Sequence, residues 1–304
     1  MKVNYKLNHI VEYLFFRAFL SALQLLPYHI SESILIGLFD LVGYRIGIRR
    51  KVAESQLEDI FPEFSPEKKR RIVRNVYKNM ALNVAEIYLL SDKDLFAKST
   101  FENSEYVQEA LARKKGVLVI EGHFGDWEAP CRILPMAGYG LAMITKQQKN
   151  HLFDDYTNAI RERQGGTIID MKNALRGVLE HTRHNDLIGI LIDQNAGKRG
   201  VLADFLGKPA SNWKGTAKIA LKFQIPIVPG YVIRNKDRSL TFRFEKMIDP
   251  AGLADNEENI MLLIQQMNKS LEDIIRQYPE QWFWVHKRWK GAKHFIGKKT
   301  ESEA

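Results

Sequence analysis

The chain of 304 residues has a single cysteine, Cys131, so it cannot form an internal disulfide bond. It also has no group of Cys and His residues with the spacing of a structural zinc site. With 20 Gly and 10 Pro it lacks the composition of collagen-like or low-complexity chains. Because 45% of its residues are hydrophobic, a mostly disordered chain is excluded as well. The length therefore allows one large domain, or two small ones, with a substantial core.

A long uninterrupted apolar run is also missing. Residues 10–48 are rich in Leu, Ile and Phe, but charged side chains interrupt them, and the charge-free stretch 18–31 contains Pro27. A spanning helix needs about 20 apolar residues, and a secretory signal peptide needs a cleavage site that is absent here. Two interpretations stay open: a helix or hairpin in the bilayer surface, or a pair of buried helices. Because basic residues at 45–51 follow the apolar segment directly, we expect residues 1–50 to associate with a membrane.

The remaining sequence predicts an α/β domain over residues 51–304. Apolar runs at 116–120, 141–145, 187–193 and 227–233 read as strands, and segments at 54–90, 151–164, 172–183 and 256–278 have helical periodicity. Strands that alternate with helices predict a mixed, largely parallel sheet flanked by helices. The formal net charge of +9 indicates an anionic partner, which could be phosphate, lipid, an acidic protein or nucleic acid.

Residues 121–128, Glu-Gly-His-Phe-Gly-Asp-Trp-Glu, follow the strand predicted at 116–120. Open α/β sheets bind their ligands at the carboxyl ends of strands. Asp126 is a candidate N-cap, with Glu128 in the next helical turn and His123 in the loop before it. A carboxylate bonded to one imidazole nitrogen makes the other nitrogen a base for a hydroxyl. His123 and Glu128 are thus either a catalytic pair or a loop histidine and a carboxylate that interacts with the helix dipole. No metal site is predicted.

Two further polar groups follow predicted elements. Arg161 and Arg163 end the helix predicted at 151–164, where arginines can hold a phosphate or an oxyanion, or simply interact with the helix dipole. Asp193 and Gln194 end the strand predicted at 187–193, as site residues or as part of a turn.

The segment 278–290 interleaves Trp and Phe with basic residues, and residues 287–299 contain no acid. This mixture suits a phosphorylated lipid headgroup at an interface, or stacking and phosphate contacts with single-stranded nucleic acid. The simpler alternative is that the tryptophans are core residues and the basic tail is solvated. Arg288, within this segment, is a candidate for substrate binding.

Together these segments resemble the bacterial lipid A late acyltransferases, the lauroyl and myristoyl transferase family. The similarity runs from about Tyr13 to Trp289 in the right order. It includes the YLFFRAF start, the FPEFSPEKKRRI helix, and the His-x-x-x-x-Glu motif at His123 and Glu128. The histidine motif alone has low specificity, whereas the long block 193–234 and the ending PEQWFWVHKRW are specific features.

The resemblance implies a glycerolipid acyltransferase-like fold and transfer of a fatty acyl chain from acyl carrier protein, or acyl-CoA, to a glycolipid hydroxyl. It implies that His123 is the general base and Glu128 its orienting partner. It also implies that Arg161 or Arg163 lies near the thioester oxyanion. The remaining candidates are taken as substrate-binding residues: Asp193, Gln194 and Arg288.

The expected function is that of an O-acyltransferase of lipid A biosynthesis at the cytoplasmic face of the bacterial inner membrane. We expect neither a cofactor nor a nucleic-acid partner. The acidic carrier protein and a phosphorylated glycolipid acceptor both suit a basic chain. The alternatives are an acyltransferase for another membrane glycolipid or a lysophospholipid, a non-catalytic basic binder of membranes or nucleic acid, and a metal-dependent hydrolase.

Overall fold

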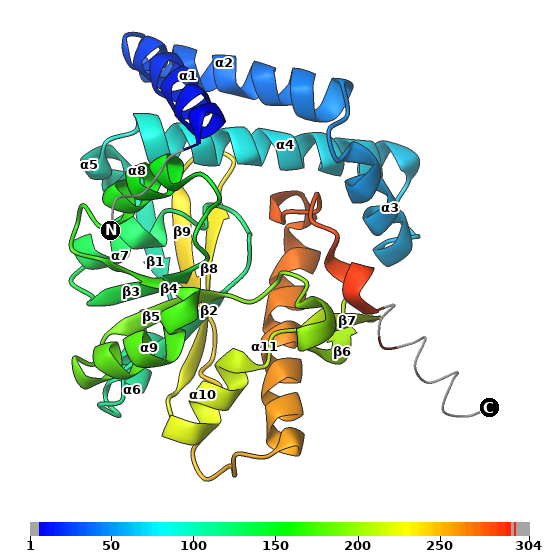
Figure 1. The fold of residues 1–304 in the computed structure, drawn as a ribbon. Helices are drawn as coiled ribbons and strands as arrows, with labels where there is room; N and C mark the ends of the chain where they lie inside the picture. Colours follow the sequence, from blue (N-terminus) through cyan, green and yellow to red (C-terminus); the bar gives the residue numbers. More distant parts are fainter. Residues whose placement is uncertain (1–5, 293–294, 296–304) are drawn as a thin grey trace.

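A seven-stranded mixed sheet forms the centre of the protein (Figure 1). The computed structural model describes residues 6–292 and residue 295. In spatial order the strands are β1 (Ser99–Glu102), β9 (Leu240–Phe244), β8 (Ile227–Arg234), β2 (Val117–Glu121), β5 (Leu187–Leu191), β3 (Leu141–Thr145) and β4 (Thr167–Asp170). The five strands from β8 to β4 are parallel, whereas β9 is antiparallel to β8 and β1 is parallel to β9. The predicted α/β class with a largely parallel sheet is confirmed.

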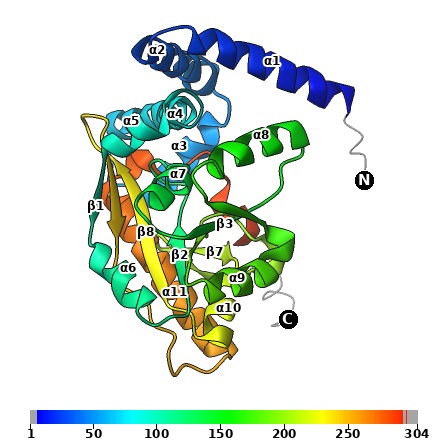
Figure 2. The same cartoon turned by 90° about the vertical axis from the view of Figure 1, so that its left-hand side faces the viewer.

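Helices cover both faces of this sheet because alternate residues of each strand point to opposite sides. On β2, Val117 and Val119 pack with one cluster, and Leu118 and Ile120 with the other. The first cluster takes side chains from α5 (Asp92–Ala97), α6 (Ser104–Leu111) and α7 (Pro130–Met136). The second takes them from α9 (Ala174–Arg183), α10 (Gly215–Phe223) and α11 (Glu257–Gln277). Figures 1 and 2 show where these helices lie beside the sheet. Helix α8 (His151–Arg161) connects β3 to β4.

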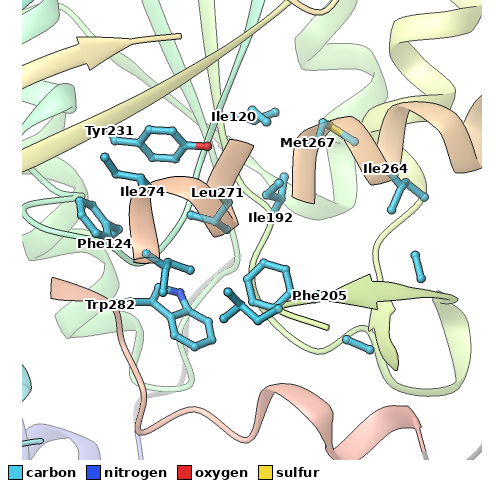
Figure 3. Packing of buried hydrophobic residues seen from close by; sticks show 14 of the residues in the cluster. Ile120, Phe124, Ile192, Phe205, Tyr231, Ile264, Met267, Leu271, Ile274 and Trp282 are labelled. Atoms are coloured by element: carbon cyan, nitrogen blue, oxygen red, sulfur yellow. The ribbon is translucent and has the colours of Figure 1, made fainter. Parts of the chain in front are cut away.

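The second cluster extends beyond the sheet to a small hairpin and the end of the chain. Strands β6 (Val201–Phe205) and β7 (Lys208–Asn212) form the antiparallel hairpin. Short 3-10 turns lie at Met171–Asn173 (η2), Gly197–Arg199 (η3), Pro279–Gln281 (η4) and Arg288–Ala292 (η5). Figure 3 shows Trp282 beside Phe205 of the hairpin, with Leu271 of α11 above them, and the Phe205 and Trp282 ring centroids are 5.6 Å apart. Burial of these large side chains fixes the closing segment against the strand ends that carry the site residues.

The N-terminal helices form a layer above the sheet (Figure 1). They are α1 (Leu7–Gln24), α2 (Tyr28–Phe39), the π-helical turn η1 (Asp40–Arg45), α3 (Arg50–Ile60) and α4 (Pro66–Leu89). The helix predicted over 54–90 is therefore two helices, separated by a loop that contains Pro62. Ser65 caps α4, since its hydroxyl accepts a hydrogen bond from the Lys68 backbone N–H, and Pro66 follows at the first helical position.

This N-terminal layer leaves much apolar surface uncovered. Helix α2 packs along α4, and Leu23 and Leu35 are buried there with Ala81 and Ala85. Most of the large hydrophobic side chains that stay exposed lie in the same layer: Leu7, Val11, Leu14, Phe15, Leu25, Leu26, Ile30, Ile34, Leu38, Leu41, Ile46 and Ile48. Among the described residues, no helix is long and apolar enough to cross a membrane. The division into units at 1–50 and 51–304 stays a prediction.

Candidate active site

His123 and Asp193 meet at the carboxyl edge of the sheet. His123 lies in the loop after β2, and Asp193 follows the neighbouring strand β5. The Nδ1 atom of His123 lies 2.7 Å from Asp193 Oδ1, and the His123 backbone N–H donates to Asp193 Oδ2 at 2.9 Å. The side chain of His123 is 18% exposed and that of Asp193 only 3%. The imidazole therefore reaches solvent while its carboxylate partner stays buried.

This contact determines the protonation of the pair. Burial alone raises the pKa of Asp193, but the charge of His123 and hydrogen bonds from His123 and Trp282 lower that pKa to about 2. Burial also lowers the pKa of His123, and the Asp193 charge and hydrogen bond outweigh it, so that the net direction is upward. An ionised Asp193 accepts a hydrogen bond from Nδ1–H, and Nε2 is then the basic nitrogen of the neutral ring.

Two more side chains hold this arrangement. Trp282 Nε1 donates to Asp193 Oδ2 at 2.9 Å from the interior side. Gln194, the residue after Asp193, places its amide nitrogen 3.1 Å from His123 Nε2. In this structure Gln194 thus occupies the position beside Nε2 that a substrate hydroxyl would take, and it stays a candidate for substrate binding. Asp193 was expected to bind substrate as well, but its two carboxylate oxygens bond to His123 and Trp282 instead.

Glu128 does not bond to His123, in contrast to the predicted orienting role. Its carboxylate instead forms a bidentate pair with Arg161, from Nε at 2.8 Å and Nη2 at 2.7 Å. The Asp126 carboxylate caps the short turn before α7, and Glu128 lies in that turn rather than in the helix. The negative charge of Glu128 still raises the pKa of His123, after the larger contributions of Asp193. Glu128 therefore acts on His123 through its charge and not through a hydrogen bond.

The two candidate arginines have different environments. The side chain of Arg161 is 12% exposed and also donates from Nη1 to Asn158 at 2.9 Å. Arg163 is 49% exposed and lies 3.5 Å from an Asp92 oxygen. Arg161 thus points toward the site, and Arg163 toward solvent. Placement near a thioester oxyanion stays a prediction for Arg161.

Helix α8, which ends in Arg161, is fixed to the N-terminal layer by an aromatic cluster. Phe16 of α1 lies 4.3 Å from Phe153 between ring centroids, and Tyr88 of α4 stacks on Tyr156 at 5.9 Å. The guanidinium of Arg17 lies 4.2 Å above the Tyr156 ring. Cation–π contacts of this kind stabilise by about 0.5–2 kcal/mol. Helix α1, which carries several of the exposed apolar side chains, is therefore in direct contact with α8, whose Arg161 bonds to Glu128.

A buried polar network supports the His123 loop from behind. Gly125 adopts φ +54°, and a Cβ atom there would lie 1.6 Å from the Val232 carbonyl oxygen, so only glycine fits. Its carbonyl accepts hydrogen bonds from Asn79 at 3.0 Å and Asn83 at 2.8 Å, both on α4. The same two side chains accept hydrogen bonds from Arg234 at the end of β8. Helix α4 thereby fixes the loop to the sheet.

Three buried carboxyl groups accompany this network. Burial and the neighbouring Glu86 charge raise the pKa of Asp126 well above its ordinary value. Burial also acts on Glu86, but the Arg234 charge at 2.5 Å outweighs it and lowers that pKa. Burial, with smaller contributions from Glu128 and Asp126, raises the pKa of Glu121 to about 8. Burial thus favours the neutral forms of Glu121 and Asp126, whereas Asp193 and Glu128 each have a positively charged or hydrogen-bonding partner, His123 and Arg161.

Arg288 and the tryptophans of the closing segment lie in the interior, which corrects two expectations. Arg288 has no exposed surface; its Nη1 donates to the Ser211 carbonyl at 2.6 Å, and its Nη2 to Asn212. Burial lowers its pKa to about 10. Trp282 and Trp284 are also buried, so they are core residues and not interfacial anchors. Arg288 thus fixes the hairpin and has no exposed surface that a substrate could contact. Beyond residue 292 the basic stretch 287–299 lies outside the described residues, except for residue 295.

The site therefore contains the base His123 with its carboxylate partner Asp193, and the charged pair of Glu128 and Arg161. Within residues 6–292, no three His, Cys, Asp or Glu side chains are grouped so that they could hold a metal ion. The acid–base pair is suited to removing a proton from a hydroxyl. Residues 1–291 match the family model described as bacterial lipid A biosynthesis acyltransferase.

The chain belongs to this family. It is accordingly an O-acyltransferase, and the family assigns it to acyl transfer in lipid A biosynthesis. The lipid A biosynthesis acyltransferase of Haemophilus influenzae is 24% identical over 88% of this chain and 84% of its own length.

Two relatives from Escherichia coli K12 are similar to the chain over most of their length. The lipid A biosynthesis lauroyltransferase is 24% identical over 87% of each chain. The lipid A biosynthesis myristoyltransferase is 22% identical over 91% of this chain and 86% of its own. Among solved structures, the 1-acyl-sn-glycerophosphate acyltransferase PlsC from Thermotoga maritima aligns with a TM-score of 0.39 and 16% identity, over 81% of this chain and 98% of that one.

Proposed function

We propose that this protein transfers a fatty acyl chain from acyl carrier protein, or acyl-CoA, to a hydroxyl of a phosphorylated lipid A precursor. The observation that carries the proposal is the contact between His123 Nδ1 and Asp193, which leaves Nε2 as a base at the carboxyl edge of the sheet. The family assignment supports the lipid A precursor as acceptor. Transfer from acyl-CoA and transfer from acyl carrier protein use the same thioester chemistry.

In the proposed reaction, the acceptor hydroxyl displaces Gln194 from His123 Nε2. As the hydroxyl oxygen attacks the thioester carbonyl carbon, Nε2 takes its proton. The C–O ester bond forms and the C–S bond breaks. The thiolate leaves and takes the proton from the imidazolium, so that the enzyme returns to its starting state. Asp193 stabilises the imidazolium while it exists and keeps Nδ1 protonated throughout.

The Arg161–Glu128 pair supports the same step electrostatically. Glu128 places a second negative charge near the ring, and this favours the imidazolium that forms during attack. Arg161 holds that carboxylate by two parallel hydrogen bonds, a geometry that lysine cannot reproduce. In this proposal Glu128 acts on the proton transfer, and Arg161 is the residue that positions Glu128.

We also propose that the protein works at the cytoplasmic face of the bacterial inner membrane. The exposed apolar side chains of α1 and α2 support this, because a monomer in water rarely leaves so many large apolar groups uncovered in one layer. Basic residues follow these helices at Arg45, Arg49 and Lys51 and suit an anionic lipid surface. The acceptor's acyl chains are held in the bilayer, so its hydroxyl must reach His123 near the headgroups.

The test is mass spectrometry of the lipids of a bacterial host that lacks its own late acyltransferases. Expression of this chain is expected to add the mass of one acyl chain to the lipid A precursor, with His123→Ala as the inactive control. Addition of the chain to a lysophospholipid or to another glycolipid would assign a different acceptor. Loss of the activity of the purified enzyme with a chelator would instead favour metal-dependent chemistry.

A further inference from the structure

Helix α9 has an outward face on which apolar and basic side chains lie together. Its inner side packs on the sheet, where Val178 is fully buried. On the outer side, Leu175 is 48% exposed, and Met171 in the preceding turn η2 is 45% exposed. Among the described residues after Ile48, only one further large hydrophobic side chain is exposed, Leu262, and it is less exposed than these two, at 39%.

Cations surround this apolar pair. Lys172, Arg176 and Arg183 are exposed, and their spacing of four and seven residues places them along one side of the helix, beside Leu175. A surface groove runs along the helix between them, with Glu180 as its acid. In the part of the chain that the structure describes, none of the three forms an ion pair. Elsewhere on the surface, cations such as Arg50, with Glu54, do have acidic partners.

The topology extends this basic surface to the active site. The strands β2, β5, β3 and β4 are neighbours in that order and are parallel, so their carboxyl ends share one edge of the sheet. His123 follows β2, and exposed cations follow each of the other three strands: Lys198 and Arg199 after β5, Lys146 and Lys149 after β3, and Lys172 after β4. At a spacing of about 4.8 Å, three strand intervals span roughly 15 Å.

Resting on the function proposed above, we propose that the α9 face, defined as Met171, Lys172, Leu175 and Arg176, is the docking surface for an acidic acyl carrier protein. Carboxylates of the carrier pair with Lys172 and Arg176, and apolar side chains beside them cover Met171 and Leu175. Cations without internal partners attract an acidic protein without first breaking an ion pair. The acyl chain on its flexible arm then follows the basic strand ends toward His123.

A protein fits this face better than a bilayer or a coenzyme does. Figures 1 and 2 both place α9 well below the layer of α1 and α2, so a flat membrane bound to that layer does not reach it. A coenzyme needs a few converging phosphate contacts, whereas here the cations are spread along ten residues of helix and three strand ends. Exposed apolar residues with cations beside them are typical of a protein interface.

The test compares two donors on one charge-reversal variant, Lys172→Glu with Arg176→Glu. The donors are a lauroyl carrier protein and lauroyl-CoA, and the acceptor is dispersed in detergent. We expect kcat/KM for the carrier protein to fall at least tenfold while the value for the CoA thioester changes less than twofold. The variant Lys172→Arg with Arg176→Lys should behave as wild type. Equal loss with both donors would overturn the docking surface.

The matched control reverses two charges at the opposite edge of the sheet. Lys115 precedes β2 and Lys246 follows the antiparallel strand β9, and both are exposed. Lys115→Glu with Lys246→Glu changes the net charge by the same amount, and we expect carrier-dependent turnover to stay within twofold of wild type. If kcat/KM for the carrier protein falls as much in this control as in the α9 variant, the effect comes from net charge, and a localised docking surface is contradicted.

Direct binding separates this inference from the proposed reaction. Titration calorimetry with a carrier that bears a non-hydrolysable amide-linked acyl chain requires no turnover. We expect binding to the wild type and the Lys115/Lys246 control, and at least tenfold weaker binding to the α9 variant. Carrier binding through α9 without acylation of the lipid would contradict the proposed function and support the docking surface.

Turnover of the CoA donor without carrier binding would contradict the docking surface and support the proposed acyl transfer. If the α9 variant loses binding to anionic vesicles and not to the carrier, α9 is a membrane contact.

Discussion

The Nδ1 atom of His123 lies 2.7 Å from Oδ1 of Asp193, a residue 70 positions later in the chain. The two residues follow the neighbouring parallel strands β2 and β5, so the register of the sheet determines their contact. The aspartate is fixed in turn by the indole of Trp282. The base of the proposed reaction is thus positioned by three segments that are distant in sequence.

Replacement of Asp193 by Asn tests this contact. Without the negative charge, Nδ1 no longer has an ionised acceptor and the imidazolium is less stable. We expect the maximal rate to fall by roughly 10² to 10⁴-fold. Asp255→Asn, an exposed substitution in the loop before α11, should leave the rate unchanged. A maximal rate for Asp193→Asn within threefold of wild type would show that this hydrogen bond has no role in catalysis.

The pH profile should change in a defined direction. In wild type the pKa of His123 is raised above its ordinary value of 6.5, chiefly by Asp193 against the opposing effect of burial. Because the base must be neutral, the rate should rise with pH through this raised pKa. Loss of the Asp193 charge lowers that pKa, so the acidic limb of Asp193→Asn should move to lower pH while its plateau falls. Measured profiles that share one acidic limb would contradict this electrostatic coupling.

Arg161 and Arg163 should respond differently to substitution by lysine. Arg161 forms two parallel hydrogen bonds with Glu128, and an ammonium group cannot form both at once. We expect Arg161→Lys to lower kcat by tenfold or more, with little change in KM, and Arg163→Lys to retain nearly full activity. Steady-state kinetics on the two purified variants decides this. Two silent substitutions would leave both arginines with only a helix-dipole role.

Arg288 is expected to contribute to stability and not directly to substrate affinity. Arg288→Ala leaves the buried Ser211 carbonyl and the Asn212 side chain without their donor, at about 1–3 kcal/mol for each. We expect a loss of about 3 kcal/mol in the free energy of unfolding, measured by urea denaturation, with KM unchanged in the fraction that stays folded. A fully stable variant with a strongly raised KM would restore the predicted role in substrate binding.

The outer face of α1 should carry the membrane affinity. Leu14 and Phe15 are 60% and 76% exposed, and each contributes about 1.5–3 kcal/mol if it becomes buried in an apolar layer. Leu14→Ser with Phe15→Ser should therefore weaken sedimentation with liposomes more than tenfold, at low and at high salt. The matched control, Met171→Ser with Leu175→Ser on α9, should sediment as wild type. If the wild-type protein does not sediment with liposomes, the proposed membrane association is contradicted.

The sequence predicted most of the sheet because its strands are short apolar runs between strong helical patterns. The bounds of β3 were predicted in full, and those of β5 and β8 to within two residues. The short edge strand β1 was missed, since its half-exposed residues Ser99–Glu102 form no apolar run. The helical pattern over 54–90 is interrupted because Pro62 and the capping residue Ser65 fall between two segments that are both helical.

The structure brings several of the candidate site residues together but pairs them differently from the prediction. His123, Glu128, Arg161 and Asp193 all lie together, but spacing along the chain suggested Glu128 as the partner of His123. The actual partner comes from the adjacent strand, and only the sheet order β2–β5 brings it there. The signal that could have indicated it is that Asp193 and His123 both follow buried parallel strands. Burial of Arg288 could not be inferred, because its partners Ser211 and Asn212 lie on a hairpin distant in sequence.

The most direct test of the central claim is the single-turnover rate of acyl transfer by His123→Ala under saturating donor and acceptor. His123 supplies the base, so the account predicts a chemical step slowed by roughly 10² to 10⁴-fold. Circular dichroism should match wild type, although the unfolding midpoint should fall, since the buried Asp193 loses the imidazole of His123 and keeps only the backbone N–H of that position and the Trp282 donor. A folded His123→Ala enzyme that transfers the acyl chain at the wild-type rate would contradict the account.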